Sequence, residues 1–439
     1  MLAVELGHHV TAGDLRANHR TAALEKRGVA VYLGHDTTHV DGVDEVVISG
    51  GVPTDNPVVT AARRAGKPVL GRTEALAELL RGSRVLSVVG SFGKSTTTAL
   101  AGAALRSIDP TMYMGADATD AICGVRVGSG PDSIVETCEY RDEMLCMSPS
   151  ALLMTGLWEN HEDWFGPGTD GVVEAFSRLI DSRDPELLVA CSDSPAVADL
   201  LEQAAGSTEA VTFGVDASAD YRVTGHSPSD DGVAFELRPP EGEAIHAWSP
   251  VPGEHGAVNA AGALTLAMTQ GVEPRTAARD LARAAVPYRR FEWRIRDNRL
   301  DLVDDNARLP AQIATSLRTA RELRPGRRLV AVCGFWGRLN ARNLPATARS
   351  LRAADVVLPF ELGGNATSAG GAERDDSISR LAELLGADGV QCEEYSEKAL
   401  LDGVDEGLPA CVITLGYDGE LDRFRQVEDV LRRYLGRPG

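Results

Sequence analysis

The chain has 439 residues, of which 43% are hydrophobic, and a formal net charge of −20 at pH 7. This length predicts two or three domains, and the acidic charge argues against nucleic acid as a general partner. No apolar run reaches the roughly 18 residues of a membrane span, and the first residues form no secretion signal, so we expect no membrane partner.

The first domain, predicted over residues 1–82, alternates short apolar runs with helical stretches, which is typical of a doubly wound α/β fold. Strands are predicted at 9–12, 29–33, 45–49 and 68–70, with a helix over 57–65. The sequence starts within a helix, whereas a dinucleotide-type fold would place a strand and a Gly-rich loop before it. We therefore expect that this loop is absent or that the start of the sequence is late.

The most informative stretch follows an apolar run at 85–89, which predicts a buried parallel strand. It precedes an Ala- and Leu-rich run at 99–105, which predicts a helix. The stretch between the two, residues 90–98, begins with Gly90, Ser91, Phe92, Gly93, Lys94, Ser95 and Thr96. A Gly-rich turn between a strand and a helix predicts a phosphate-binding loop, in which Lys94 reaches the terminal phosphates and the Ser95 hydroxyl binds Mg²⁺. Because it stands in a loop, the Lys94 side chain is expected to be exposed.

Two further polar residues follow the next predicted strands. Glu139 ends the stretch at 133–139, and His161 follows the strand predicted at 152–155. Parallel α/β sheets bind ligands at this edge, and a carboxylate and an imidazole there suit a divalent ion beside the Ser95 hydroxyl. Taken alone, Glu139 would be interpreted as a surface acid and His161 as a residue at the start of a helix. Because a phosphate loop is predicted upstream on the same sheet, a Mg²⁺ site shared by the two is favoured.

The rest of the chain predicts a side sheet and a third α/β domain. A strand is expected at 187–190, an antiparallel side sheet over 211–248, a turn at 252–256 and a helix over 259–271. Beyond these, strands are predicted at 300–304, 328–333, 355–360 and 411–415, with helices at 310–323 and 421–435. The domains are therefore expected at 1–82, 83–288 and 289–439. Seven scattered cysteines indicate reduced core residues in a cytoplasmic protein.

Motifs spread over nearly the whole chain make it similar to the Mur ligase family, and most similar to the branch that joins L-alanine to UDP-N-acetylmuramate. They lie at Asp14, 34–35, 49–57, 71–76, 90–97, 135–140, 160–161, 252–259, 289–291, 304–305 and 335–342. The resemblance implies a three-domain α/β architecture, with a Rossmann-like first domain, a central domain like P-loop ATPases and an α/β third domain. It also implies an ATP- and Mg²⁺-dependent ligase that phosphorylates a carboxylate and couples it to an amino acid.

The resemblance implies roles for individual residues. Lys94 matches the lysine that contacts the β- and γ-phosphates of ATP. Ser95, Glu139 and His161 match the residues around Mg²⁺. The implied catalytic residues are Lys94, His161 and Arg290. Asn259 and Asp305 match positions that hold adenosine, Arg290 lies near the phosphates, and Asp14, His255, Arg308, Arg338 and Arg342 match substrate contacts. The implied partners are a small carboxylic acid, UDP-linked in this branch, and an amino acid. Phosphoryl transfer consists mostly of positioning and charge neutralisation, which agrees with this set.

Several positions depart from the family pattern. Gly156 and Gly256 stand where the family usually has Asn, Asn306 replaces a Tyr, and residues 336–338 read Trp-Gly-Arg. No Lys lies between 94 and 398, which excludes the carbamoylated lysine of several sibling ligases. Two alternatives stay open: a paralogue of natural-product metabolism that joins a different acid and amino acid, and a nucleotide-binding relative without turnover. From the missing Gly-rich loop we expect a preference for an acid other than UDP-N-acetylmuramate.

Overall fold

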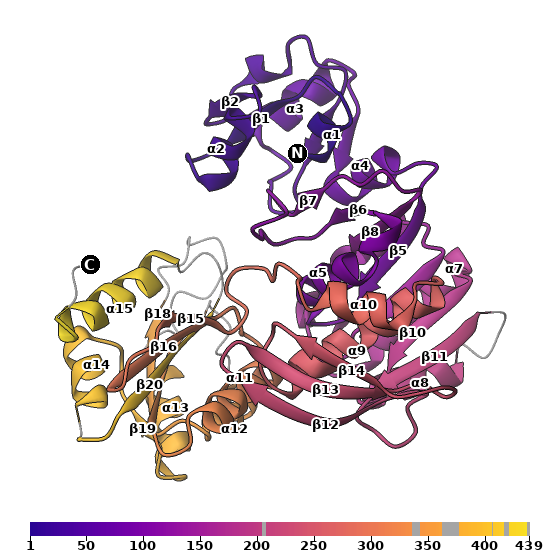
Figure 1. Ribbon diagram of the computed structural model, residues 1–439. Helices are drawn as coiled ribbons and strands as arrows, with labels where there is room; N and C mark the ends of the chain where they lie inside the picture. The colour runs from indigo at the N-terminus through magenta and orange to yellow at the C-terminus, as the bar shows by residue number, and fades with distance from the viewer. Residues whose placement is uncertain (204–207, 336–342, 362–376, 406, 417–420, 437–439) are drawn as a thin grey trace. The chain divides into compact units, whose positions relative to one another are not determined.

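The computed structural model describes the chain except residues 204–207, 336–342, 362–376, 406, 417–420 and 437–439 (Figure 1). Its contacts divide the chain into two compact units. The first unit comprises residues 1–226, 234–250 and 257–287, and the second unit comprises 227–233, 251–256 and 288–439. The three domain boundaries drawn from the sequence stay a prediction.

The first 80 residues form short α/β elements with two small parallel sheets, β1–β2 and β3–β4. Helix α2 begins at the side chain of Asn18 and helix α3 at that of Asn56, each of which accepts backbone N–H bonds as an N-cap. All four predicted strands and the predicted helix are present. The elements are α1 (Leu2–Glu5), β1 (Thr11–Asp14), α2 (His19–Glu25), β2 (Ala30–Leu33), η1 (Thr37–Val40), β3 (Val46–Ile48), α3 (Pro57–Arg64), β4 (Val69–Gly71) and α4 (Arg72–Leu79).

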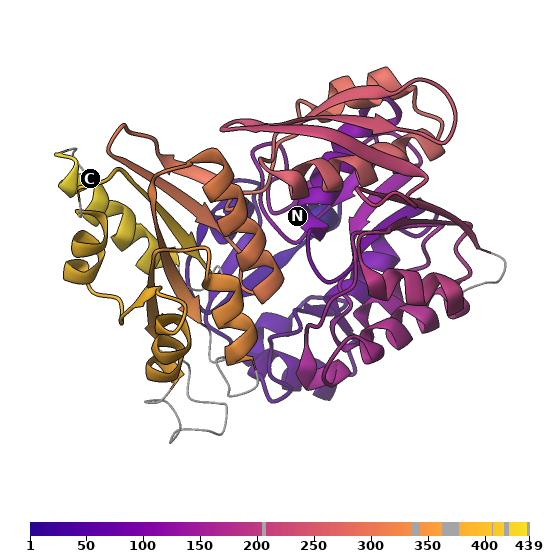
Figure 2. The same ribbon diagram turned by 90° about the horizontal axis from the view of Figure 1, so that it is seen from below.

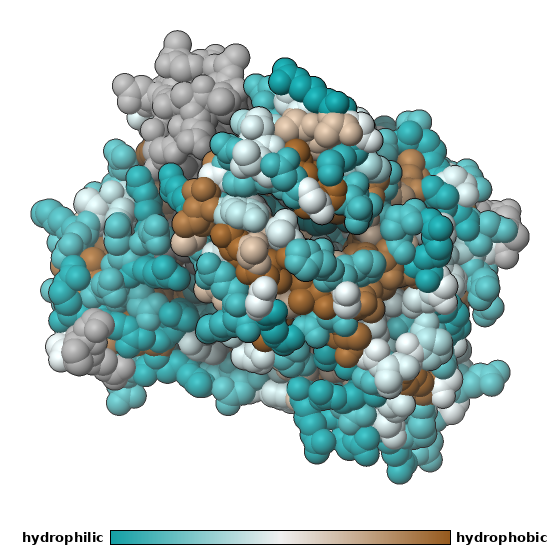
Figure 3. Space-filling model, turned by 90° about the horizontal axis from the view of Figure 1, so that it is seen from above, coloured by the Kyte–Doolittle hydropathy of each residue, from teal (hydrophilic) through white to brown (hydrophobic). Residues whose placement is uncertain are grey.

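Large apolar side chains of this segment remain exposed, among them Leu15 at 71%, Leu33 at 61% and Val47 at 50%. Figure 3 shows a face on which hydrophobic side chains appear in the middle of a mostly hydrophilic surface. Parallel sheets are ordinarily covered on both faces. The exposure of Leu33 and Val47, which lie in β2 and β3, therefore shows that these two-stranded sheets are only partly covered.

The rest of the first unit is built on one ten-stranded sheet, in the order β14-β13-β12-β11-β10-β9-β5-β8-β6-β7. The side sheet predicted over 211–248 is wrong as a separate sheet, because β11 pairs in parallel with β10 and continues the central one. The strands are β5 (Arg84–Val89), β6 (Thr111–Tyr113), β7 (Val125–Arg126), β8 (Asp132–Glu136), β9 (Ala151–Met154), β10 (Leu187–Cys191), β11 (Glu209–Gly214), β12 (Tyr221–Ser229), β13 (Gly232–Arg238) and β14 (Ile245–Ser249).

Helices cover this sheet and bury its central strands. Phe176, Leu179 and Val197 pack on one face from α7 and α8, against apolar residues of β5, β9 and β10. Strands β8, β5 and β9 run in parallel, so their carboxyl ends meet at one edge of the sheet. The helices are α5 (Lys94–Ala104), η2 (Arg106–Ile108), η3 (Tyr140–Cys146), α6 (Glu162–Phe165), α7 (Asp170–Arg183), α8 (Pro195–Gln203), α9 (Glu254–Thr269) and α10 (Pro274–Leu281). Helix α9 takes in part of the turn predicted at 252–256.

The second unit is a six-stranded sheet in the order β15-β16-β20-β17-β18-β19, parallel except for β15. Helices α11, α12 and α13 pack on one face, and α14 and α15 on the other (Figure 2). The elements are β15 (Glu292–Ile295), β16 (Leu300–Asp305), α11 (Pro310–Leu323), β17 (Arg328–Phe335), α12 (Leu344–Leu351), β18 (Val356–Glu361), α13 (Ser377–Gly386), β19 (Gln391–Cys392), α14 (Glu397–Val404), β20 (Ala410–Leu415) and α15 (Leu421–Tyr434).

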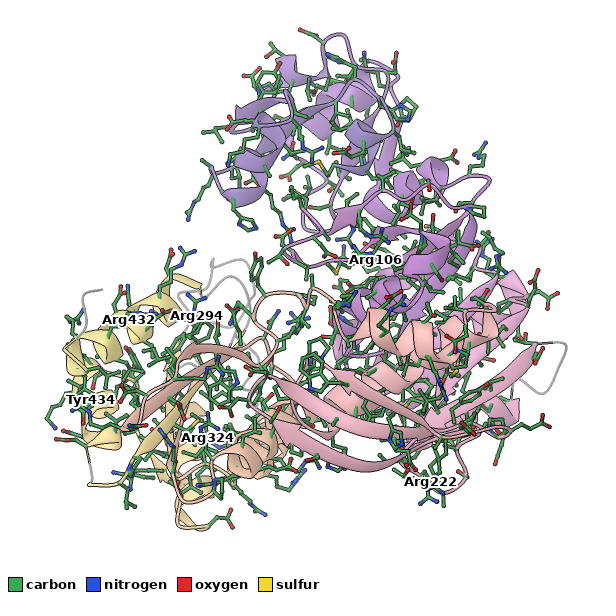
Figure 4. All side chains as sticks on the ribbon, in the orientation of Figure 1. Arg106, Arg222, Arg294, Arg324, Arg432 and Tyr434 are labelled. Atoms are coloured by element: carbon green, nitrogen blue, oxygen red, sulfur yellow. The ribbon has the colours of Figure 1, made fainter. Side chains whose placement is uncertain are left out.

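Ion pairs reinforce the second unit. Arg324 pairs with Asp230 at 2.6 Å and also with Asp301, and its guanidinium lies 4.4 Å from the ring centroid of Trp293. Hydrogen bonding to Asp230 raises the pKa of Arg324 above its ordinary value, although burial opposes this. Figure 4 labels Arg324 together with other arginines of this unit. The residues at 227–233 are therefore tied to the end of α11 and to β16.

Within the described part of the chain, no helix is both long and apolar enough to cross a membrane. The cysteines differ in burial: Cys191, Cys333 and Cys411 are buried, whereas Cys146 is exposed and the other three are half-buried. The expectation that all seven are core residues is therefore wrong for Cys146.

Candidate active site

The phosphate loop requires glycine at its two ends. Gly90 has φ +127°, and a Cβ there would lie 2.5 Å from Thr155 Oγ1. Gly93 has φ +84° and is the N-cap of α5, in a conformation that side chains with a Cβ rarely adopt. The Thr155 hydroxyl, just past β9, hydrogen-bonds with the carbonyl of Phe92 at 2.6 Å. The loop is thus fastened to the neighbouring strand.

Trp158 fastens the same loop from the other side. The Ser91 hydroxyl donates to the Trp158 carbonyl and accepts from its N–H, both at 2.8 Å, and the Phe92 and Trp158 rings stack with centroids 4.0 Å apart. A Cβ on Gly156, which has φ +128°, would lie 2.2 Å from the Trp158 ring. The presence of glycine instead of the family's Asn is explained by this ring, which leaves no room for a side chain.

Lys94 is the first residue of α5 and points to the carboxyl edge of β8. Its Nζ donates to Glu139 Oε2 at 2.8 Å and to the Gly90 carbonyl at 2.5 Å. The side chains of Lys94 and Glu139 are only 12% and 1% exposed, so the expectation of an exposed lysine is wrong. Burial lowers the pKa of the Lys94 ammonium, but Glu139 and other nearby acidic groups outweigh it and hold this pKa above its ordinary value.

Two consecutive residues reach the other carboxylate oxygen of Glu139. Asn160 Nδ2 donates to Glu139 Oε1 at 2.6 Å, and His161 Nε2 lies 3.8 Å from the same atom. The His161 ring stacks on Tyr140, with centroids 4.5 Å apart, and the Tyr140 hydroxyl donates to Asp163 at 2.8 Å. The aromatic contact therefore holds the imidazole beside Glu139.

Backbone conformations that residues with side chains rarely adopt cluster around this carboxylate. His161 has φ +49°, and Arg141 and Asp142, just after Glu139, have φ +55° and +57°. Such conformations cost of order 1–3 kcal/mol each and concentrate at functional sites. The cost indicates that the fold imposes this arrangement of Glu139 and His161.

The residues at this edge fit a hard divalent cation. The carboxylate of Glu139 already faces a positive charge, the Lys94 ammonium, and the Ser95 hydroxyl follows in the same turn of helix. Oxygen ligands of this kind suit Mg²⁺. No three His, Cys, Asp or Glu side chains cluster anywhere in the described ranges. A Mg²⁺ ion held here would therefore complete its coordination with phosphate oxygens and water.

Helix α9 brings Asn259 to the phosphate loop. Its Oδ1 would lie 3.1 Å from a Cβ on Gly93. His255 precedes it by one helical turn, so the two residues share one side of the helix. Burial, with a smaller contribution from the charge of Arg318, lowers the pKa of His255 to about 4, so its imidazole is neutral at pH 7. Its Nδ1 is buried without a hydrogen-bond partner among the described residues.

The predicted site residues of the second unit form a polar network of their own. Arg290 Nη1 donates to Asn306 Oδ1 at 3.0 Å, with the Asn306 amide oriented so that its Nδ2 donates to the Gly416 carbonyl. Burial raises the pKa of Asp305, although the Ser316 hydroxyl, which donates to it, opposes this. The expectations that Arg290 lies near the phosphates and that Asp305 holds adenosine stay predictions.

The remaining predicted substrate residues are less informative. Asp14 accepts hydrogen bonds from the backbone of Arg16 and the side chain of Asn18, both at 3.1 Å, so it stabilises its own loop. Arg308 is exposed just before α11. Arg338 and Arg342 lie outside the described residues.

Sequence reasoning missed two residues of this site, Asn160 and Thr155. Both stand between β9 and the predicted His161, and both are buried polar residues. The sequence did carry a signal for them. Thr155 is a polar residue at the end of the predicted strand, and Asn160 is a polar residue directly before His161. This signal could not show that their partners would be Glu139 and Phe92, since those contacts join separate strands.

Comparisons with known proteins match the chain to a family and to individual enzymes. A model described as "Mur ligase family, catalytic domain" matches residues 1–84, and one described as "Mur ligase middle domain" matches residues 130–267. The UDP-N-acetylmuramate–L-alanine ligase of Clavibacter michiganensis is 34% identical over 337 residues, 75% of this chain and 69% of that protein. The ligase of the same name from Saccharopolyspora erythraea is 31% identical over 371 residues, 82% of this chain and 75% of that protein.

Solved structures show the same fold. The UDP-N-acetylmuramate–alanine ligase of Thermotoga maritima superposes with a TM-score of 0.79 at 22% identity, over 99% of this chain and 95% of that one. A murein peptide ligase of Psychrobacter arcticus gives a TM-score of 0.70 at 20% identity, over 97% and 95% of the two chains. The predicted three-domain α/β architecture is confirmed. Together the relatives favour a ligase that resembles the alanine-adding branch over the two alternatives left open by the sequence.

Proposed function

The chain belongs to the Mur ligase family of ATP-dependent amide-forming ligases, and we propose that it joins UDP-N-acetylmuramate to L-alanine. The names of its curated relatives support these substrates. The observation that carries the proposal is the buried Lys94–Glu139 pair beside a glycine-ended phosphate loop. The product would enter peptidoglycan synthesis.

Phosphoryl transfer is the first step that these residues serve. The backbone N–H groups of the phosphate loop bind phosphate oxygens at the start of α5, and Lys94 leaves Glu139 to neutralise the charge that develops on the transferred group. Ser95, Glu139 and His161 would hold Mg²⁺, which would supply further charge neutralisation. The substrate carboxylate oxygen attacks the γ-phosphorus, the bond to the β-phosphate oxygen breaks, and ADP leaves with an acyl phosphate formed.

Amide formation is the second step. The unprotonated amine attacks the acyl carbon, the bond between that carbon and the phosphate oxygen breaks, and inorganic phosphate leaves with one proton released from nitrogen. We assign Arg290 to the phosphates, and Asn259 and Asp305 to adenosine. His255 is neutral at pH 7 and is assigned to the substrates. Asp14, Arg308, Arg338 and Arg342 stay proposed substrate contacts.

The test is product formation by the purified chain with ATP and Mg²⁺. We expect ADP and phosphate to appear only when UDP-N-acetylmuramate and L-alanine are both present, with a product of the mass of their amide. Parallel reactions contain other amino acids or acids without UDP. Turnover only with an acid lacking UDP would contradict the substrate proposal.

The metal site has its own test, which uses Mn²⁺ as a probe. Glu139→Gln and His161→Ala are each expected to weaken Mn²⁺ binding in the presence of ADP, measured by the electron paramagnetic resonance of free Mn²⁺. Removing one charged ligand should cost tenfold or more, since interactions with charged groups are worth about 1.5–3 kcal/mol. Glu162→Gln, a change at the first residue of α6 that removes a carboxylate next to His161, is the control. Unchanged Mn²⁺ affinity in both variants would exclude these residues as ligands.

A further inference from the structure

Asn160 is the buried polar residue of this site to which neither the sequence nor the proposed mechanism gives a role. Its side chain lies between β9 and α6, and the residue is 5% exposed. We propose that Asn160 is a positioning residue that fixes Oε1 of Glu139, so that Oε2 is the oxygen released by Lys94 and taken over by the divalent cation. The inference rests on the proposed function for the identity of that cation.

The two oxygens of the Glu139 carboxylate have different partners. Oε2 accepts from Lys94 Nζ at 2.8 Å, and Oε1 accepts from Asn160 Nδ2 at 2.6 Å. A buried carboxylate is costly unless its oxygens are paired. Lys94 must leave Glu139 when it serves a phosphate, and Asn160, which is not part of the phosphate loop, is then the partner that remains.

The backbone explains how two consecutive residues reach one oxygen. In an extended strand, neighbouring side chains point to opposite faces. Here His161 has φ +49°, and its Nε2 lies 3.8 Å from the oxygen to which Asn160 donates. This left-handed turn brings both side chains to Glu139, and its cost in free energy indicates that the arrangement is maintained for the site.

A second observation points to a ligand. The Oδ1 atom of Asn160 is buried and has no hydrogen-bond partner within the described residues. Buried acceptors are nearly always paired in folded proteins. A donor that arrives with the nucleotide, such as a water molecule bound to the cation, would pair this atom. The orientation of the amide follows from its bond to Glu139, which as a carboxylate only accepts.

The experiment compares Asn160→Leu, which keeps the size but removes the donor, with Asn160→Ser, whose hydroxyl can still donate. Asn298→Leu, in an exposed turn of the second unit, is the matched control. We expect Asn160→Leu to weaken Mn²⁺ binding in the presence of ADP about ten- to hundredfold, and Asn160→Ser to restore part of it. The half-saturating Mg²⁺ concentration for ligation should rise by the same factor, with the KM for the amino acid within twofold of wild type.

A lower melting temperature with unchanged Mn²⁺ affinity would overturn the proposal, because a purely structural role predicts that result. If Asn160→Leu does not fold, Asn160→Ala, which also removes the donor, takes its place, and unchanged Mn²⁺ affinity of that variant has the same meaning. Binding of Mn²⁺ and ADP is measured without acid or amino acid. A wild-type chain that fails to ligate but shows Mn²⁺ affinity dependent on Asn160 would therefore contradict the proposed function and leave this inference standing.

Discussion

Replacing Lys94 with alanine should destabilise the first unit as well as stop catalysis. The ammonium of Lys94 lies 2.8 Å from a carboxylate that is 1% exposed. Removing one partner of a buried ion pair costs about 3–5 kcal/mol, because the remaining charge stays buried without compensation. Since Asn160 continues to donate to Glu139, we expect the lower end, about 3 kcal/mol, which is a decrease in Tm of about 6 °C for a unit of this size.

Urea unfolding followed by tryptophan fluorescence measures this change, since Trp158 and Trp164 both lie in the first unit. The matched control is Lys398→Ala, because the Lys398 side chain is 86% exposed and pairs with an exposed aspartate; such surface pairs are worth less than about 1 kcal/mol. The double variant Lys94→Ala with Glu139→Gln should regain most of the lost stability, since a neutral amide needs no cation.

Equal stability of the Lys94→Ala and Lys398→Ala variants would refute the argument from burial. ATP turnover reports separately on the phosphate loop: it should be abolished in Lys94→Ala and unchanged in Lys398→Ala. Ligation at the wild-type rate by Lys94→Ala would refute the assignment of Lys94 to the phosphates.

Three further predictions follow from buried contacts. Burial lowers the pKa of His255 to about 4 in the folded protein, against 6.5 ordinarily. The unfolded chain therefore binds this proton at a higher pH than the folded one, and the free energy of unfolding should fall by about 3 kcal/mol as the pH falls from 6.5 to 4. His255→Phe should remove this loss, as measured by acid denaturation. Gly156→Asn should lower stability by about 2 kcal/mol or more. Adding Trp158→Ala should recover part of this loss; if thermal unfolding showed the effects of the two substitutions to be additive, this explanation would be wrong. Arg289→Met should cost about 3–5 kcal/mol in the second unit, because its guanidinium pairs with the buried carboxylate of Asp304; a loss under 1 kcal/mol would show that the pair is dispensable.

Much of the fold could be predicted because its patterns are local. The apolar run before Gly90 is β5, and the helix predicted after the phosphate loop is α5. Helix α11 has the bounds that the sequence predicted. The sequence did not show that β11 to β14 extend the central sheet, because their alternating pattern fixes one buried face and not the strand to which each pairs.

By itself the sequence determined the strand, turn and helix around the predicted phosphate loop, since the glycines at 90 and 93 and the lysine after them have their effect within one turn of chain. It also determined which residues would stand at the carboxyl ends of β8 and β9, because strands alternate with helices in a parallel sheet. Only the tertiary structure decided that Lys94 is buried on Glu139, that Asn160 holds the same carboxylate, and that Trp158 excludes a side chain at Gly156. The first two contacts join residues that follow different strands, β5, β8 and β9, so they depend on how these strands pack. The third lies within the loop after β9 and depends on the Trp158 ring, which stacks on Phe92 from the loop after β5.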